Sequence, residues 1–494
     1  MRKRDAAPVP RSGDRPATGP ASAQGGDHVR ALLFQTPRNV SELDRWAIAF
    51  VVFIALAWGA GMVAGFQASL TILTVAGFLA AIFGLHKPLV GLLGIGMLCT
   101  MDAVSRVLLL TGGLLRWNTL NYWLILVIGL NLTFVLRLRD IQSRLALVFV
   151  LLLTLGLLLV DREDLETGVM SVLNVVIYFG ILVYFAPGRR NPRVWYLQGI
   201  VSGTLAALGS FVYFLQKDGL PYVNPNAWSY FPLTAIFSLS LGYRFAPRGW
   251  RGQALSWVLA VANLGWVFLS GSRGSLLVAL ACMLFLLLTT RSVSQRILYV
   301  AVALGIALIT IARFGDLNAD AVHRISKLLD PQESFAARTS GRSDLALGAW
   351  YIFRDHPMGV GTGGFAQAWI NMGYRQSLSG FAYGREMQAH SGWTKTLAEN
   401  GVPGFLALLC FVGSFAVVGW KRKQRGMWPI GLLATSVYAL AFMSTDFAGK
   451  GLWFFAAGAT TLLNLRVLTV RERPGADGPG RTKGETVRAE EIRA

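Results

Sequence analysis

The segment LVFVLLLTLGLLL, residues 147–159, decides the fold class of this chain. Its apolar residues do not alternate with polar ones, as they would on a strand of a membrane barrel. Similar apolar runs recur along the chain, many of them near the ~20 residues that a helix needs to cross a bilayer. Hydrophobic residues make up 54% of the 494 and charged residues only 15%. The sequence therefore predicts an all-α fold, a polytopic bundle of transmembrane helices.

The apolar runs predict about 12–14 spans. We place them at residues 46–66, 68–85, 89–110, 119–136, 143–160, 168–187, 194–215, 230–246, 253–270, 274–290, 296–313, 402–420, 428–446 and 450–466.

Five regions follow from these spans. Residues 46–313 form a bundle of about 11 spans, and residues 402–466 form the remaining spans. Between them, residues 314–401 form one large external loop, which we expect to carry short helices and the functional residues. The tails, residues 1–45 and 467–494, are rich in Gly, Arg and other residues that bury little apolar surface, so we expect them to be disordered.

Basic residues set the predicted orientation. The short loops on one side carry 16 Lys and Arg residues and those on the other side carry five. The positive-inside rule assigns the richer side, with both termini, to the cytoplasm. The large loop then lies outside the cytoplasmic membrane. The net charge of +20 sits in loops and tails beside the membrane, where it meets anionic lipid, and we do not expect nucleic-acid binding.

The first polar motif is LSGSRGSLLVAL, residues 269–280. Gly271 and Gly274 allow a tight reversal at the end of a span, and Ser275 is placed to cap the next helix. Arg273 lies at the edge of the bilayer, where it either reaches harmlessly to the interface or holds a lipid-linked phosphate.

The second motif is SGRSDLALGAWYIFRDHPMGVGTGGF, residues 340–365. It predicts a helix with Arg342 in its first turn and an end at His356 and Pro357. The following turn lacks the Gly-Lys-Ser/Thr of a nucleotide-binding loop and no strand precedes it. Tight packing against the bundle is the favoured interpretation of its glycines, and Gly361 and Gly363 are also candidate substrate contacts.

The third motif is AHSGWTKTLAENGVPG, residues 389–404. His390 precedes a short predicted helix that Gly401 and Pro403 end just before the next span. A histidine at the boundary between water and lipid can accept a proton.

Together, these three motifs resemble the O-antigen ligase and Wzy polymerase superfamily of bacterial membrane glycosyltransferases. The resemblance covers residues 271–404, and it implies a GT-C-like bundle in which Arg273, Arg342 and His390 are catalytic. Where many members have asparagine after the histidine, this chain has Ser391. We further expect substrate contacts from Arg338, Ser272, Trp393, Gly361 and Gly363.

Members of that superfamily move a glycan from an undecaprenyl diphosphate carrier to a hydroxyl acceptor without a metal or nucleotide sugar. The resemblance thus implies no cofactor, a glycan, lipid or protein acceptor, and inversion at the anomeric carbon. The two arginines would stabilise the departing diphosphate, and His390 would accept the acceptor proton or orient the acceptor. Polymerisation of repeat units and ligation of finished polymer remain equally open.

Two other functions remain as alternatives. A transporter of lipid-linked oligosaccharide would usually show internal repeats, and none is clear in this sequence. A non-catalytic scaffold would tolerate loss of His390. Aromatic side chains of the loop suit either sugar stacking or simple packing: Trp350, Trp369, Tyr374, Phe381, Tyr383 and Trp393.

Overall fold

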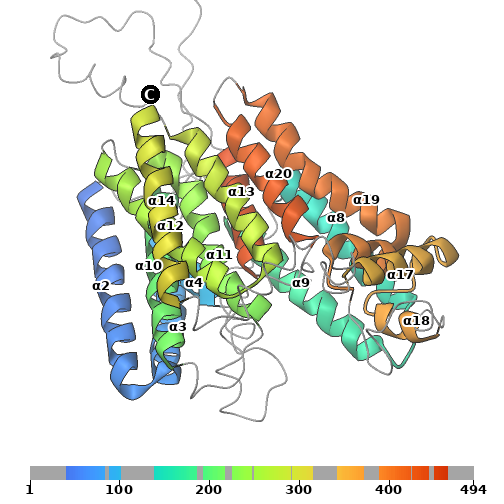
Figure 1. The fold of residues 1–494 in the computed structure, drawn as a ribbon. Coiled ribbons are helices and arrows are strands. Elements are labelled where there is room, and N and C mark those ends of the chain that lie inside the picture. The colour runs from blue at the N-terminus through green and yellow to red at the C-terminus, as the bar shows by residue number, and fades with distance from the viewer. Residues whose placement is uncertain are drawn as a thin grey trace, which may run out of the picture.

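The computed structural model describes residues 40–83, 88–101, 138, 140–185, 193–216, 225–246, 250–290, 292–314, 342–371, 389–423, 426–443 and 450–464. All regular elements in these ranges are helices, and no strand occurs among them. The prediction of an all-α, polytopic membrane bundle is confirmed (Figure 1).

Six of the described helices are long and apolar enough to cross a membrane, and six shorter ones are also apolar. The predicted span 119–136 lies outside the described residues. The bundle helices are α2 (Val40–Ala64), α3 (Phe66–Phe83), α4 (Pro88–Thr100), α8 (Ile141–Leu155), α9 (Leu165–Phe185), α10 (Arg193–Gln216), α11 (Pro225–Gly242), α12 (Trp250–Leu269), α13 (Arg273–Thr289), α14 (Val293–Phe314), α19 (Gly392–Lys421), α20 (Trp428–Ala441) and α21 (Lys450–Leu463).

Helices α11 and α13 run in the same direction, which defines the two ends of the bundle. At their beginnings, the hydroxyl oxygens of Ser229 and Ser275 lie 2.7 Å apart. At their other ends, the hydroxyl oxygens of Tyr243 and Thr290 lie 2.8 Å apart. We call the first end the serine end and the second the basic end.

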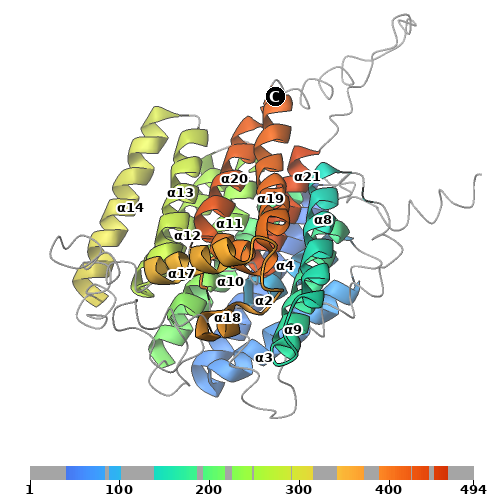
Figure 2. The ribbon, with the colours of Figure 1, turned by 90° about the vertical axis from the view of Figure 1, so that its right-hand side faces the viewer.

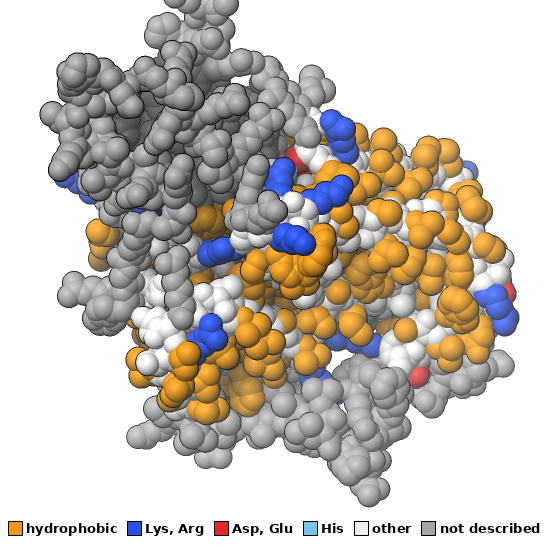
Figure 3. Space-filling view, turned by 90° about the horizontal axis from the view of Figure 1, so that it is seen from above, with side chains coloured by type: hydrophobic (Ala, Val, Ile, Leu, Met, Phe, Trp, Pro, Cys, Tyr) orange, Lys and Arg blue, Asp and Glu red, His pale blue; other side chains and the backbone are white. Residues whose placement is uncertain are grey.

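The basic end gathers Lys and Arg side chains, as Figure 3 shows in a view onto that end. Arg244 donates to the carbonyl of Gly426, and Arg422 donates to the carbonyl of Leu463. Arg296 donates to the carbonyl of Thr290, which ends α13. These arginines belong to the loops that the sequence assigns to the basic side of the membrane.

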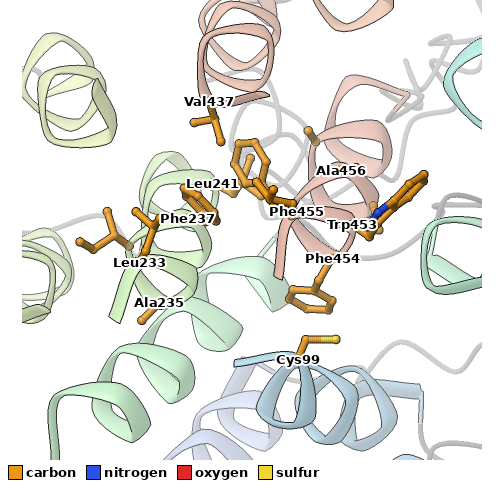
Figure 4. Close-up of a cluster of buried hydrophobic side chains, with 14 of the residues drawn as sticks. Cys99, Leu233, Ala235, Phe237, Leu241, Val437, Trp453, Phe454, Phe455 and Ala456 are labelled. Carbon is orange, nitrogen blue, oxygen red and sulfur yellow. The ribbon is translucent and has the colours of Figure 1, made fainter. Parts of the chain in front are cut away.

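A buried cluster of large side chains joins α11, α20 and α21 (Figure 4). The rings of Phe237 and Phe455 lie 5.1 Å apart, and the hydroxyl of Tyr438 donates to the carbonyl of Leu452 at 2.6 Å. Such interlocking rings leave little freedom for one helix to slide along another. The core therefore fixes the end of α20 beside the beginning of α21, and α21 beside the second half of α11.

Two loop helices, α17 (Arg342–Asp355) and α18 (Phe365–Asn371), lie outside the bundle proper. α17 runs across the bundle helices, against the side of the bundle near the serine end (Figures 1 and 2). Its buried face includes Gly348, where an added Cβ would lie 1.8 Å from the ring of Trp369. This close contact leaves room only for glycine. Trp369 is buried, so packing is the correct interpretation of this aromatic residue.

Candidate active site

The reversal before α13 places Arg273 at the serine end. Gly271 has a φ of +68°, a backbone conformation that residues with a Cβ rarely adopt. Ser272 is the N-cap in an extended conformation, without a capping bond from its side chain. The prediction that Ser275 caps this helix is wrong, because its hydroxyl lies inside the helix and bonds to Ser229 and Ser272.

Three serine hydroxyls form a buried chain at this position. The hydroxyl of Ser272 donates to that of Ser275 at 3.1 Å, and Ser275 lies 2.7 Å from Ser229. All three residues are at least 96% buried. A buried hydroxyl without a partner costs about 1–3 kcal/mol, so the chain stabilises this arrangement of the two helices. It connects the turn that carries Arg273 to the first turns of α11.

Arg342 is the first residue of α17, as the second motif predicts. Burial lowers the pKa of its guanidinium below the usual value, and the interaction with the nearby Tyr230 phenol partly opposes this shift. An arginine nevertheless stays protonated at neutral pH. Tyr230 follows Ser229 in α11, so Arg342 lies close to the turn of α11 that is bonded to the Arg273 helix.

His390 immediately precedes the cap of α19. It is exposed and has a φ of +49°, which is uncommon outside glycine. The Ser391 hydroxyl accepts from the Thr394 N–H and donates to the carbonyl of Phe442 at 2.9 Å. The helix therefore begins at a defined point just after the last turn of α20.

Trp393 fastens the same segment to α20. Its indole N–H donates to the carbonyl of Ala439 at 3.0 Å, and its ring meets Phe442 edge-on at 5.6 Å. α20 begins beside the basic end, where Arg244 donates to the carbonyl of Gly426, and runs toward the serine end. Near its end, Tyr438 bonds to the beginning of α21, which packs through Gly451 against the middle of α11. His390 and Trp393 thus belong to the same end of the bundle as the two arginines.

The glycine-rich turn packs between the α8–α9 connection and α19. An added Cβ at Gly361 would lie 2.5 Å from the backbone nitrogen of Val160, and one at Gly363 would lie 2.6 Å from that of Gly168. Both glycines have φ near +95° and are buried. These contacts support the packing interpretation, whereas substrate contacts at Gly361 and Gly363 stay a prediction.

The central residue of this turn is Thr362. Its hydroxyl is 2.7 Å from the carbonyl of Leu153 and 2.9 Å from the side-chain oxygen of Asn400. Asn400 and the neighbouring Glu399 are buried where α19 kinks at Gly401. The turn therefore ties the segment after His390 to the α8–α9 connection.

The structure brings most of the predicted site residues to one end of the bundle. Arg273, Ser272, Arg342, His390 and Trp393 lie at the serine end. Arg338 lies outside the described residues. Within the part of the chain that the structure describes, no three His, Cys, Asp or Glu side chains are grouped as metal ligands.

Sequence reasoning missed Tyr230 and Ser229. Both lie in the stretch NAWSY, residues 226–230, which carries no motif of its own. The sequence does not show that α11 packs beside α13, because no periodic pattern indicates which helices pack together.

Residues 258–409 match the family model of O-antigen ligase. The matched region runs from α12 through the first half of α19 and includes Arg273, Arg342 and His390. The chain carries an O-antigen ligase domain. Its apolar helices are those of a multi-pass membrane protein, and the matched domain supports an enzyme of the O-antigen ligase and polymerase type. No curated protein sequence matches the chain.

Proposed function

We propose that the protein transfers a glycan from an undecaprenyl diphosphate carrier to a hydroxyl group of a glycan, lipid or protein. The proposal rests on one observation. Arg273, Arg342 and His390 come from three separate segments of the O-antigen ligase domain and lie toward the same end of the bundle, the serine end. Two cations and an imidazole are the groups that departure of an anion and attack by a hydroxyl require.

Arg273 and Arg342 bind the diphosphate in this proposal. An arginine ~4 Å from a phosphate charge, at an effective dielectric near 20, gains about 4 kcal/mol before desolvation costs. The guanidinium also donates two parallel hydrogen bonds to phosphate oxygens. As the bond from the anomeric carbon to the diphosphate oxygen breaks, the negative charge on that oxygen increases, and both arginines stabilise it.

His390 acts on the acceptor. The acceptor oxygen attacks the anomeric carbon from the side opposite the diphosphate, so the configuration inverts. Its proton passes to the imidazole if His390 is a base, or to water if His390 only orients the acceptor. The pH profile separates these two roles. A base gives a turnover rate that rises with pH through the range where imidazoles lose their proton, and this rise disappears in His390→Gln.

The basic end suggests the orientation. Positive loops stay in the cytoplasm, so we infer that the serine end faces outward from the cytoplasmic membrane and that both termini are cytoplasmic. Residues 314–401 then form the external loop between the spans of residues 46–313 and 402–466. A diphosphate-linked glycan in the outer leaflet reaches this loop without entering the cell.

The test uses purified protein in vesicles that contain a lipid diphosphate glycan and a hydroxyl acceptor. We expect a new glycosidic bond with wild type and none with Arg342→Ala or His390→Ala proteins that insert normally. Wild-type transfer by both variants would reject the proposal in favour of a scaffold. Movement of the donor across the bilayer without a new bond would instead identify a transporter.

The length of the glycan in a deletion strain, and the molecule that carries it, distinguish a polymerase from a ligase. In a deletion strain, single repeat units on the acceptor indicate lost polymerisation. Long chains that stay on the lipid carrier indicate lost ligation.

A further inference from the structure

The outward face of α17 carries exposed apolar side chains that no described helix covers. Trp350 is 51% exposed, and Leu347, one turn earlier, is also exposed. The opposite face packs inward through Leu345, Ala349 and Ile352, which are buried. An exposed tryptophan beside an exposed leucine is costly in water, so this face has a partner or a lipid environment.

This apolar face continues onto a membrane-spanning helix. The N–H of Val402 donates to the carbonyl of Pro357 at 3.1 Å, which brings the turn after α17 against the span of α19. Met358 in that turn is 64% exposed. Below it, Val402, Leu406 and Leu409 form an exposed stripe at helical spacing, the pattern of a surface that faces hydrocarbon. The exposed residues of α17 and α19 thus lie on one connected surface.

The orientation of α17 fits the edge of a membrane. It lies across the bundle and along its side, and the first turns of α9 extend past it toward the serine end (Figures 1 and 2). A helix that lies in the interface places tryptophan and leucine among the lipids and its charges at the water. Arg354 and Asp355 fulfil the second condition, since both are exposed at the end of α17.

We propose that α17 is an interfacial helix, with Leu347, Trp350 and Met358 embedded in the adjacent membrane leaflet at the level of the lipid headgroups. Because α17 lies across the bundle, its first residue, Arg342, is held near the same depth. That depth is where the diphosphate of a polyprenyl carrier resides. This last consequence rests on the proposed function, whereas the embedding itself does not.

The chain provides its own reference for a depth measurement. Cys410 is exposed on α19, eight residues beyond Val402 or ~12 Å along the helix, and the other two cysteines are buried. An environment-sensitive fluorophore is attached to Cys410 of the full chain in lipid nanodiscs. It is then attached to Trp350→Cys and, as the control for water, to Asp355→Cys, both in a Cys410→Ala background.

Three quenchers report depth: iodide in water, a nitroxide near the headgroup and a nitroxide deep in the acyl chain. We expect the label at position 350 to be quenched most by the shallow nitroxide, the label at 410 by the deep one, and the label at 355 by iodide. Iodide quenching at 350 equal to that at 355 would overturn the proposal. Protection from all three quenchers would overturn it too, since protein would then cover this face.

A kinetic comparison tests the consequence for Arg342. We expect Trp350→Ser to raise the KM for the vesicle-bound donor several-fold while kcat is retained, because the donor site loses its depth. Trp420→Ser is the matched control, since Trp420 is equally exposed but lies at the basic end. An unchanged KM would reject this consequence. Lipid quenching at 350 together with an active Arg342→Ala protein would instead reject the proposed function and leave the embedding intact.

Discussion

The Ser229 and Ser275 hydroxyls, 2.7 Å apart, join the first turns of two helices that are 46 residues apart along the chain. One of these helices begins with Arg273, and the other carries Tyr230 beside Arg342. A buried hydrogen bond therefore joins the helix that begins with one proposed diphosphate ligand, Arg273, to the helix that lies beside the other, Arg342.

We expect Ser275→Ala to destabilise the protein by about 1–3 kcal/mol, because the buried Ser272 hydroxyl loses the oxygen to which it donates and Ser229 loses its bond to α13. Ser229→Ala should cost a similar amount. In the double variant, the loss should be smaller than the sum of the two single losses, since neither side of the bond then remains unsatisfied. Thermal unfolding in detergent measures all three, and strictly additive losses would show that the bond contributes nothing.

Removal of the Arg342 guanidinium should reduce transfer without unfolding the protein. We expect Arg342→Gln to lower kcat about 10²–10³-fold, as does loss of one donor to a developing anion in other enzymes. Arg342→Lys should recover part of the activity, since it keeps the charge but loses the paired donors. Initial rates with lipid-linked donor measure this.

The matched control is Arg354→Gln on the same helix. Arg354 is exposed near the end of α17, forms an ion pair with the neighbouring Asp355 and lies over the ring of Tyr351. An exposed pair of this kind contributes at most about 1 kcal/mol, so activity and stability should both be retained. Equal losses at positions 342 and 354 would point to a general effect of charge on this helix.

Replacement of His390 should separate folding from chemistry. Asparagine tolerates a positive φ better than most residues, so His390→Asn should keep the turn before α19 and lose transfer. His356→Asn is the control, because His356 is also an exposed histidine of the loop but lies directly after the last residue of α17. Transfer at the wild-type rate by His390→Asn would remove the imidazole from the mechanism.

The glycines of the turn should act on stability. Gly361→Ala and Gly363→Ala force a Cβ against backbone atoms at a positive φ, so each should cost well over ~1 kcal/mol and lower the melting temperature. Gly413→Ala in α19 has open space at its Cβ and should stabilise the helix by about 1 kcal/mol. If Gly361→Ala instead melts normally and raises the KM for donor, a role in substrate binding gains support.

Local features of the sequence predicted much of the fold. The apolar runs predicted the helices, because consecutive residues alone show whether a stretch is apolar and long enough to span a bilayer. The end of α17 at Asp355 followed from Pro357, and the break in α19 followed from Gly401 and Pro403, because these residues act on their own backbone.

Which residues lie close together in space could not be predicted in the same way. Tyr230 and Ser229 have no motif, and their roles arise only once α11 packs beside α13. Serine favours the cap position of a helix, but the Ser275 hydroxyl bonds to another helix instead. The sequence leaves Trp369 open to sugar stacking or packing, and the structure packs its ring against Gly348.

The break at Gly401 gives the spacing of this segment a chemical meaning. Residues 392–400 form a short rigid rod between the imidazole and the point where the chain turns into the span. One residue added within this segment would rotate His390 by about 100° about the helix axis, relative to the span that follows Gly401. In the proposed mechanism, the number of residues between His390 and Gly401 therefore matters as much as the side chains themselves.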